Sequence, residues 1–300
     1  MLAMAPALSG CQMDVLDPAG PIASDEKSLI ILATCLMLIV VLPVFAMIAL
    51  FTWRYRASNT KATYKPDWEH SNQIELVVWI VPCLIIIALG TVTWTSTHRL
   101  DPYRHIQSTT KPIEVDVVSL DWKWLFIYPD QKVASVNVLA LPVGTPVNFR
   151  LTSATVMDSF FIPRLGSQIY TMPGMETKLS LMASKPGDYD GISANYSGDG
   201  FSDMKFDAKA LSPADFDKWV QTAQASPNKL TLDAYHQLEK PSEKLPAATY
   251  ASVDPDLYHD ILNKCANGAA CMDQSMKMAA LKNATGVLAA NCNKPKVKGL

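Results

Sequence analysis

The sequence predicts a membrane-bound protein in which a hairpin of two transmembrane helices precedes an outer β-sandwich with a helical C-terminal extension. The chain has 26 basic and 28 acidic residues, yet none lies at positions 28–53 or 76–97. Each uncharged run exceeds the roughly 20 apolar residues that a helix needs to cross a hydrocarbon core. Short alternating runs after position 112 predict the sandwich, and helix-forming residues after position 212 predict the extension.

The composition argues against several classes of function. The formal net charge is only −2, so the chain lacks the basic excess that nucleic-acid binding requires. The sequence contains no glycine-rich phosphate loop, zinc-ligand spacing or nucleophilic triad, and its five histidines are scattered. We therefore expect no nucleic-acid partner and no catalytic site built on these motifs.

The flanks of the two spans predict the topology. The spans are expected at 29–53 and 74–97, joined by a loop at 54–73. The basic residues of this loop are Arg54, Arg56, Lys61 and Lys65. By the positive-inside rule the loop faces the cytoplasm. The segment 11–28 and all residues after the second span then lie in the periplasm, and the chain crosses the bacterial inner membrane twice.

The N-terminus carries a candidate lipid anchor at Cys11. The preceding Leu8-Ser9-Gly10 has the shape of a lipobox, so residues 1–10 resemble a lipoprotein signal that is shorter than usual and lacks a basic segment. A polar stretch separates Cys11 from the first span, as a lipobox requires. The alternative is an ordinary N-terminus with an incidental cysteine.

Glu75 is the charged residue of the second span that bears on function. A carboxylate at the cytoplasmic end of a membrane helix is either a hydrated interfacial charge or the mouth of a proton path. From the residues alone, the interfacial interpretation is favoured.

The outer domain is predicted at 98–211. Alternation of period two marks strands with one buried face, and proline and glycine pairs mark the turns between them. The alternating runs are Ile113-Glu-Val115-Asp-Val117, Ser135-Val-Asn-Val138 and Val147-Asn-Phe149-Arg-Leu151-Thr152. Such strands without helical periodicity between them indicate a β-sandwich.

The C-terminal part divides into a helical extension at 212–262 and a tail at 263–300. Ser212-Pro-Ala-Asp215 is a helix start signal, and the next apolar residues share one helical face. Cys265 and Cys271 are predicted to form a disulfide, because the compartment is oxidising and five intervening residues permit closure. Cys292 would then be unpaired, or would compete for one of the two.

Four motifs carry a resemblance to a known family. They are His70-Ser-Asn-Gln-Ile-Glu75, Asp121-Trp122-Lys-Trp124 on the expected first strand, Val156-Met-Asp-Ser-Phe-Phe-Ile-Pro163, and the stretch from Tyr189 to Phe206. Together they resemble subunit II of the haem-copper respiratory oxidases, in the ubiquinol-oxidising branch of cytochrome bo type. The resemblance covers about residues 22–258 and implies that the sandwich is cupredoxin-like.

The branch follows from the ligands that are missing. Copper-bearing members of the family hold two coppers with a Cys-x3-Cys-x3-His-x2-Met loop and an upstream histidine, a donor set suited to fast one-electron transfer. The corresponding residues here are Asp158, Ser193, Ser197, Phe201 and Met204. One thioether does not hold copper, so we expect no metal in this chain and a core role for Met204.

The resemblance implies a non-catalytic second subunit of a proton-translocating ubiquinol oxidase that reduces oxygen to water. This chain would hold no cofactor, whereas the haems and one copper belong to subunit I. Its partners would be subunit I, subunits III and IV, membrane lipid, and ubiquinol bound by the complex. The resemblance also favours Glu75 as the proton-uptake carboxylate at the cytoplasmic mouth of a path into subunit I.

A second interpretation belongs to a different functional class. The chain could be a free-standing membrane lipoprotein that delivers copper or assists oxidase assembly from the outer face. Purification distinguishes the two, because a stoichiometric haem-containing complex supports the first and an isolated copper-loaded chain supports the second.

Overall fold

The computed structural model describes residues 14–63 and 66–279; Cys11 and Cys292 lie outside these ranges. The chain divides into two compact units, one of residues 24–104 and one of residues 105–300 together with 1–23. The first unit is the helical hairpin, and the second contains the sandwich and its extension.

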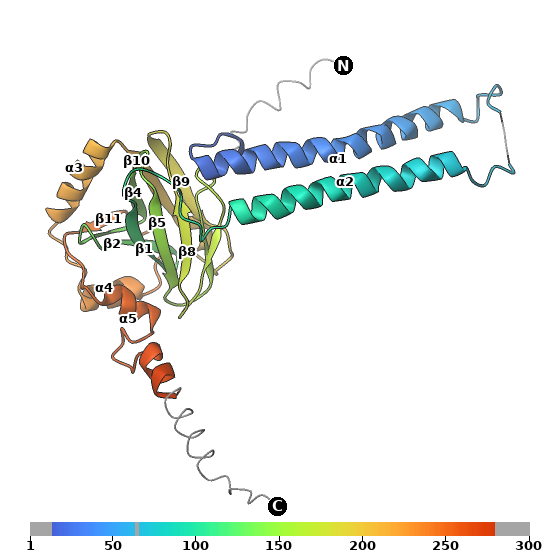
Figure 1. The fold of residues 1–300 in the computed structure, drawn as a ribbon. Coiled ribbons are helices and arrows are strands. Elements are labelled where there is room, and N and C mark those ends of the chain that lie inside the picture. Colours follow the sequence, from blue (N-terminus) through green and yellow to red (C-terminus); the bar gives the residue numbers. More distant parts are fainter. Residues whose placement is uncertain (1–13, 64–65, 280–300) are drawn as a thin grey trace, which may run out of the picture. The chain divides into compact units, whose positions relative to one another are not determined.

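The hairpin consists of α1 (Pro21–Arg54) and α2 (Asn72–Arg99), which run side by side in opposite directions (Figure 1). Both helices are long and apolar enough to cross a membrane. Their large apolar side chains are exposed in the isolated chain, as expected for surfaces that face lipid or other subunits. The predicted spans 29–53 and 74–97 lie within these helices, and α1 starts earlier because Pro21 opens a helical turn before the apolar run.

Two β-sheets pack face to face in the second unit (Figure 1). One sheet has the order β11-β3-β2-β1-β5-β8 and the other the order β4-β10-β9-β6-β7. Neighbouring strands are antiparallel except β1 with β5 and β4 with β10. The strands are β1 (Ile113–Leu120), β2 (Lys123–Tyr128), β3 (Val133–Val136), β4 (Val138–Pro142), β5 (Val147–Ser153), β6 (Asp158–Phe161), β7 (Ile169–Thr171), β8 (Thr177–Leu181), β9 (Gly187–Ser193), β10 (Lys205–Leu211) and β11 (Ala248–Tyr250).

Aromatic rings fill the space between the sheets. Phe160 and Phe206 stack with centroids 5.2 Å apart, and Trp124 meets both rings edge-on. Offset and edge-on pairs of this kind add roughly 0.5–1.5 kcal/mol each beyond the area they bury. The rings therefore fix the distance between β2, β6 and β10, the strands that carry them.

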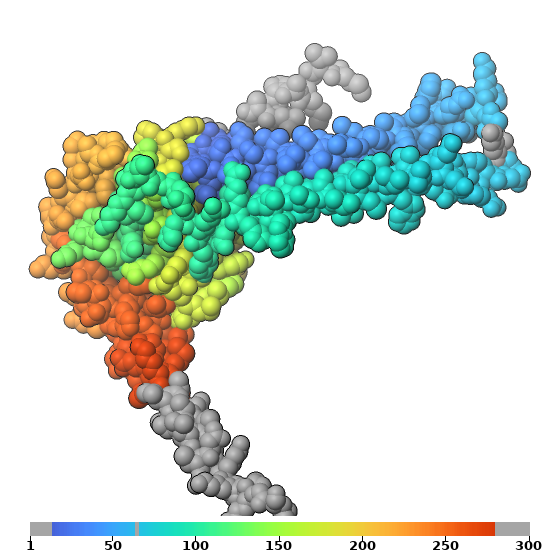
Figure 2. All heavy atoms as spheres, viewed as in Figure 1, coloured from blue at the N-terminus to red at the C-terminus, as the bar shows by residue number. Residues whose placement is uncertain are grey.

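The first sheet is buried on both faces, contrary to the expectation of one buried face per strand. All of β2 is buried, and β1 is buried from its third residue. Val117 and Phe126 point into the inter-sheet core, whereas Val118 and Leu125 point to a second core on the outer face. The extension covers that outer face, and Figure 2 shows it in orange and red as a continuous layer of atoms against the sandwich.

The extension contains α3 (Pro213–Gln224), α4 (Leu232–Glu239) and α5 (Leu257–Leu262), as the helical prediction requires. It also contains β11, which pairs with β3 and so joins the first sheet. The prediction of a purely helical extension is therefore wrong over these three residues. Phe216 of α3 packs into the inter-sheet core, whereas α4 and α5 supply the second core.

Polar contacts add to the docking of the extension. The Nζ atom of Lys123, whose side chain is fully buried, donates to the carbonyl of Lys240 at 2.7 Å. Burial lowers the pKa of Lys123. The Asn137 side chain accepts from the Trp124 amide at 2.9 Å and donates to the Leu245 carbonyl at 2.8 Å. Each contact satisfies a polar group that would otherwise cost about 1–3 kcal/mol to bury.

The turn between β1 and β2 corrects a second expectation. Asp121 and Trp122 were expected on the first strand, but β1 ends at Leu120 and pairs there with Lys123. The two residues form the turn itself, and Trp122 has a φ of 62°. A non-glycine residue with this backbone conformation is uncommon, because its Cβ crowds the following carbonyl.

The segment before α1 is docked onto the sandwich. The Ala19 amide donates to the Arg164 carbonyl, and the Ala19 carbonyl accepts from the Ser184 amide, both at 2.7 Å. Arg164 also pairs with the Asp17 carboxylate at 2.5 Å. A Cβ on Gly20 would lie only 2.4 Å from the Met182 carbonyl oxygen, so the close approach requires glycine there.

Candidate functional site

Glu75 lies in the first turn of α2, and its side chain is exposed. Its amide donates to the Ser71 carbonyl at 2.9 Å, which closes the first helical turn. The unpaired amides of a helix N-terminus carry a partial positive charge that favours a carboxylate. The uncharged stretch of α2 follows directly, so Glu75 stands where the polar loop gives way to the apolar span.

A second group of predicted residues meets at one end of the sandwich. Asp158 begins β6 and Ser193 ends the neighbouring β9, so sheet pairing brings them together. The Ser193 hydroxyl donates to Asp158 Oδ1 at 3.4 Å. Ser119 and Ser197 also hydrogen-bond this carboxyl group, which is 1% exposed.

The remaining two positions have different surroundings. Met204 is buried, and its sulfur lies 3.9 Å from the Ser197 hydroxyl. Phe201 turns its ring edge-on to Tyr196, with centroids 5.5 Å apart. The structure thus gathers Asp158, both serines and Met204, while Phe201 packs against a neighbouring ring.

The pKa of Asp158 is raised to about 6, chiefly because burial disfavours the charged form. The three serine hydroxyls oppose this shift by donating to the carboxylate. A carboxyl group with such a pKa is partly protonated in mildly acidic solution. Protonation of Asp158 therefore makes the stability of the folded state depend on pH.

These residues do not fit a copper pair. Bridging thiolates and terminal imidazoles stabilise a fast one-electron copper site, and this cluster offers two hydroxyls, one carboxyl group and one thioether. The hydroxyls already donate to the carboxyl group. The cluster is therefore a hydrogen-bonded polar core and not a set of copper ligands.

Trp122 closes the same end of the sandwich. Its indole N–H donates to the Ser197 carbonyl at 3.1 Å. A Cβ on Gly200 would lie 2.5 Å from the indole ring, so the loop presses its glycine backbone onto the ring face. These contacts give Trp122 a structural role. The loop around Gly200 thus packs against the residue whose backbone has the uncommon positive φ.

A third set of residues lies in and after α5. Cys265 and Cys271 are joined by a disulfide with Cα atoms 4.7 Å apart. His259 and Asp260 lie beside it, and sequence reasoning did not single them out. His259 and Asp260 come close to the two cysteines only because of the turn of α5 and the loop that follows it. No sequence motif predicts that arrangement.

Comparisons with known proteins give the family. Family models match three stretches: "Cytochrome C oxidase subunit II, transmembrane domain" over residues 9–95, "Cytochrome C oxidase subunit II, periplasmic domain" over 107–211, and "COX Aromatic Rich Motif" over 224–269. "Cytochrome bo(3) ubiquinol oxidase subunit 2" of Pseudomonas aeruginosa is 57% identical over 265 residues, covering 88% of this chain and 80% of that protein. The chain belongs to the ubiquinol oxidase subunit II family. "Ubiquinol oxidase subunit 2" of Acetobacter aceti is 52% identical, with 91% of this chain and 89% of that protein covered.

Membership in this family defines the setting of the chain. It is a subunit of a ubiquinol oxidase complex with subunit I as its partner, and a membrane protein with two spanning helices and a periplasmic domain. Among solved structures, the periplasmic domain of subunit II of cytochrome oxidase from Bradyrhizobium japonicum is similar at 21% identity and a TM-score of 0.37. That match covers 40% of this chain and 96% of the other.

Proposed function

We propose that, within the ubiquinol oxidase, this subunit carries no redox centre, braces subunit I, and supplies Glu75 as the proton-uptake carboxylate. The observation that carries the first part is the polar core around Asp158. The side chains around Asp158 hydrogen-bond to one another. None of them is a thiolate or an imidazole, the ligands of an electron-transfer copper pair.

Without a copper pair, this subunit does not receive electrons from a soluble donor. Ubiquinol then gives its electrons to subunit I, which holds the haems and one copper of the complex. Subunits III and IV complete the assembly in the inner membrane. The oxidase couples this electron transfer to reduction of oxygen to water and to proton translocation.

The position of Glu75 supports the proton role. An exposed carboxylate in the first turn of α2 can exchange protons with water at little desolvation cost. The basic loop 54–73 orients this end of the helix toward the cytoplasm, where the protons consumed in oxygen reduction originate. A fixed carboxylate at that boundary is the group that a proton path into subunit I needs.

A lipid at Cys11 completes the proposal. Acylation takes place on the outer side of the membrane, the side that the charge pattern assigns to the N-terminus. Residues 17–20, which follow a few positions later, are bound to the periplasmic domain by the Asp17 and Ala19 contacts. An acyl chain would thus be tethered close to the sandwich.

Purification of the intact complex tests the absence of a redox centre. We expect one copper per oxygen-reducing site, ubiquinol oxidation at full rate, and no oxidation of reduced cytochrome c. Two further coppers with a purple chromophore, or turnover with cytochrome c, would overturn the proposal. Recovery of the chain alone with bound copper would instead support the copper-delivery interpretation.

A further inference from the structure

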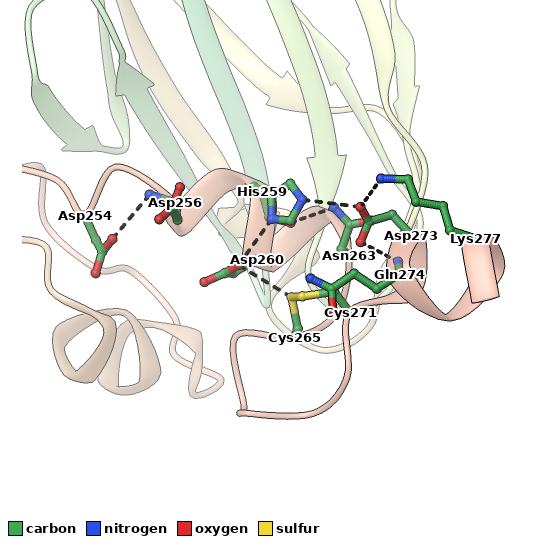
Figure 3. Close-up of polar contacts among 10 residues, drawn as sticks. All are labelled: Asp254, Asp256, His259, Asp260, Asn263, Cys265, Cys271, Asp273, Gln274 and Lys277. Atoms are coloured by element: carbon green, nitrogen blue, oxygen red, sulfur yellow. Dashed lines mark hydrogen bonds and ion pairs between the residues drawn. A yellow bond between two sulfur atoms is a disulfide. The ribbon is translucent and has the colours of Figure 1, made fainter.

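The residues around the Cys265–Cys271 disulfide form a compact cluster that the oxidase function does not use (Figure 3). Asp260 of α5 faces the Cys265 sulfur, and His259 lies beside Asp260 with its ring toward Asp273. The histidine Nδ1 lies 3.3 Å from Asp260 Oδ1, and Cys265 Sγ lies 3.5 Å from the same oxygen. One atom from each of the four residues lies within 4.8 Å of the other three.

The donor types are those of a thiophilic metal site. Two thiolates, one imidazole and one carboxylate bind Zn²⁺ in a tetrahedron with bonds of about 2.0–2.3 Å. Such bonds place the ligand atoms about 3–4 Å apart, a spacing that the present cluster already approaches. The sulfurs, however, are bonded to each other, and a disulfide does not supply thiolates.

Backbone hydrogen bonds hold the loop in place independently of the disulfide. The Cys265 amide donates to the Asp260 carbonyl, and the Gly268 amide to the Cys265 carbonyl, both at 2.9 Å. The Met272 amide donates to the Asn263 carbonyl at 2.9 Å and so fastens the second cysteine to the end of α5. Reduction therefore frees the sulfurs while the backbone keeps them near His259 and Asp260.

Asp273 lies beside the other nitrogen of the histidine ring. Its Oδ2 lies 3.8 Å from His259 Nε2 and 3.3 Å from Lys277 Nζ. A carboxylate on one imidazole nitrogen leaves the other free for a metal, an arrangement common in metal proteins. The His259 side chain is 50% exposed, so an ion can reach the cluster from solvent.

We infer that the disulfide masks a site for one thiophilic divalent ion such as Zn²⁺, formed by His259, Asp260, Cys265 and Cys271. A dithiol reductant opens the site: two electrons and two protons pass to the bridge, the S–S bond breaks, and the reductant becomes a disulfide. The ion then replaces the two thiol protons, which pass to water. When a disulfide oxidant takes up two electrons from the thiolates and is itself reduced to a dithiol, the S–S bond re-forms and the ion is expelled.

Cobalt binding tests the inference on the full-length chain purified in detergent. The chain is reduced with dithiothreitol, desalted without oxygen and titrated with Co²⁺, whose bonds to thiolates give intense charge-transfer absorption. We expect one Co²⁺ per reduced chain, displaced by Zn²⁺, and no such absorption from the oxidised chain. The inference is overturned by absorption before reduction or by its absence after reduction.

Variants locate the site. The double variant Cys265→Ser/Cys271→Ser keeps the other four cysteines and should lose the absorption. His259→Ala should weaken binding at least about tenfold, and Asp273→Asn about 10–100-fold as a positioning residue. His236→Ala, at a partly exposed histidine on α4, should bind like the parent chain. An unchanged signal in the double cysteine variant, or equal losses in the two histidine variants, would refute the site.

Discussion

At the scale of single residues, Asp158 shows how one buried carboxyl group makes the stability of the fold depend on pH. Its carboxyl group is 1% exposed among hydroxyl groups, with no cation among the partners that oppose its raised pKa. Burying an unpaired carboxylate is expensive, so the neutral form is favoured. The Asp158 carboxyl group is therefore tolerated in the core when it is neutral, and it costs stability once it is ionised.

Asp158→Asn is expected to stabilise the chain in neutral and basic solution. The pKa of Asp158 rises from 3.8 to about 6 on folding, so the folded state holds its proton more tightly than the unfolded chain. This contribution is complete below about pH 4 and is lost as pH rises through 6, a difference of about 3 kcal/mol at most. The uncharged amide avoids that loss, so the variant should be about 1–3 kcal/mol more stable at pH 8 and similar at pH 4.

Unfolding followed by tryptophan fluorescence at pH 4, 6 and 8 measures the effect. Asp199→Asn serves as the control, because Asp199 is exposed in the neighbouring loop and should show no difference at any of these pH values. A less stable Asp158→Asn chain at pH 8 would show that the carboxylate is a favourable partner in the folded state.

At the scale of elements, the sequence predicts the two spans and the sandwich because hydropathy and period-two alternation are local properties. It also identifies Asp158 and Ser193 through a motif. It does not reveal Ser119, because this residue reaches Asp158 from β1 through the packing of the two sheets. The second core was missed for the same reason: the run from Lys123 to Tyr128 is buried on both faces only because a distant segment covers it.

Ile261→Ala tests the docking of that segment. Ile261 of α5 is 4% exposed in the second core, and removal of a buried isoleucine side chain typically costs 2–5 kcal/mol. We expect a loss of about 2–4 kcal/mol and faster proteolysis of the extension. Met276→Ala, at a side chain 59% exposed, should change stability by no more than about 0.5 kcal/mol. Equal behaviour of the two variants would mean that α5 is not held by this core.

At the scale of the whole molecule, the two spans hold the chain in the membrane far more strongly than the lipid anchor does. A single acyl chain binds membranes marginally, whereas two spanning helices insert almost irreversibly. Cys11→Ser should therefore abolish acyl labelling and leave ubiquinol oxidation unchanged. Metabolic labelling with palmitate and activity in the same membranes measure both effects. Labelling that persists in the variant would reject Cys11 as the acylated residue.

The proposed division of labour places electron transfer in subunit I and proton uptake partly in this chain. Glu75 is the residue on which that division depends, because it is the carboxylate at the start of the second span. Glu69 is an exposed acidic residue in the loop just before α2 and provides a matched control. Both residues can be changed to glutamine, which keeps the side-chain shape but does not titrate.

Steady-state ubiquinol oxidation per haem by Glu75→Gln enzyme is the most direct measurement. If Glu75 collects protons, turnover should fall about tenfold or more while haem content and subunit composition stay normal. Glu75→Asp should retain much of the rate because it keeps a titratable group, and Glu69→Gln should match the wild type. Wild-type turnover by a normally assembled Glu75→Gln oxidase would contradict the proton-uptake role.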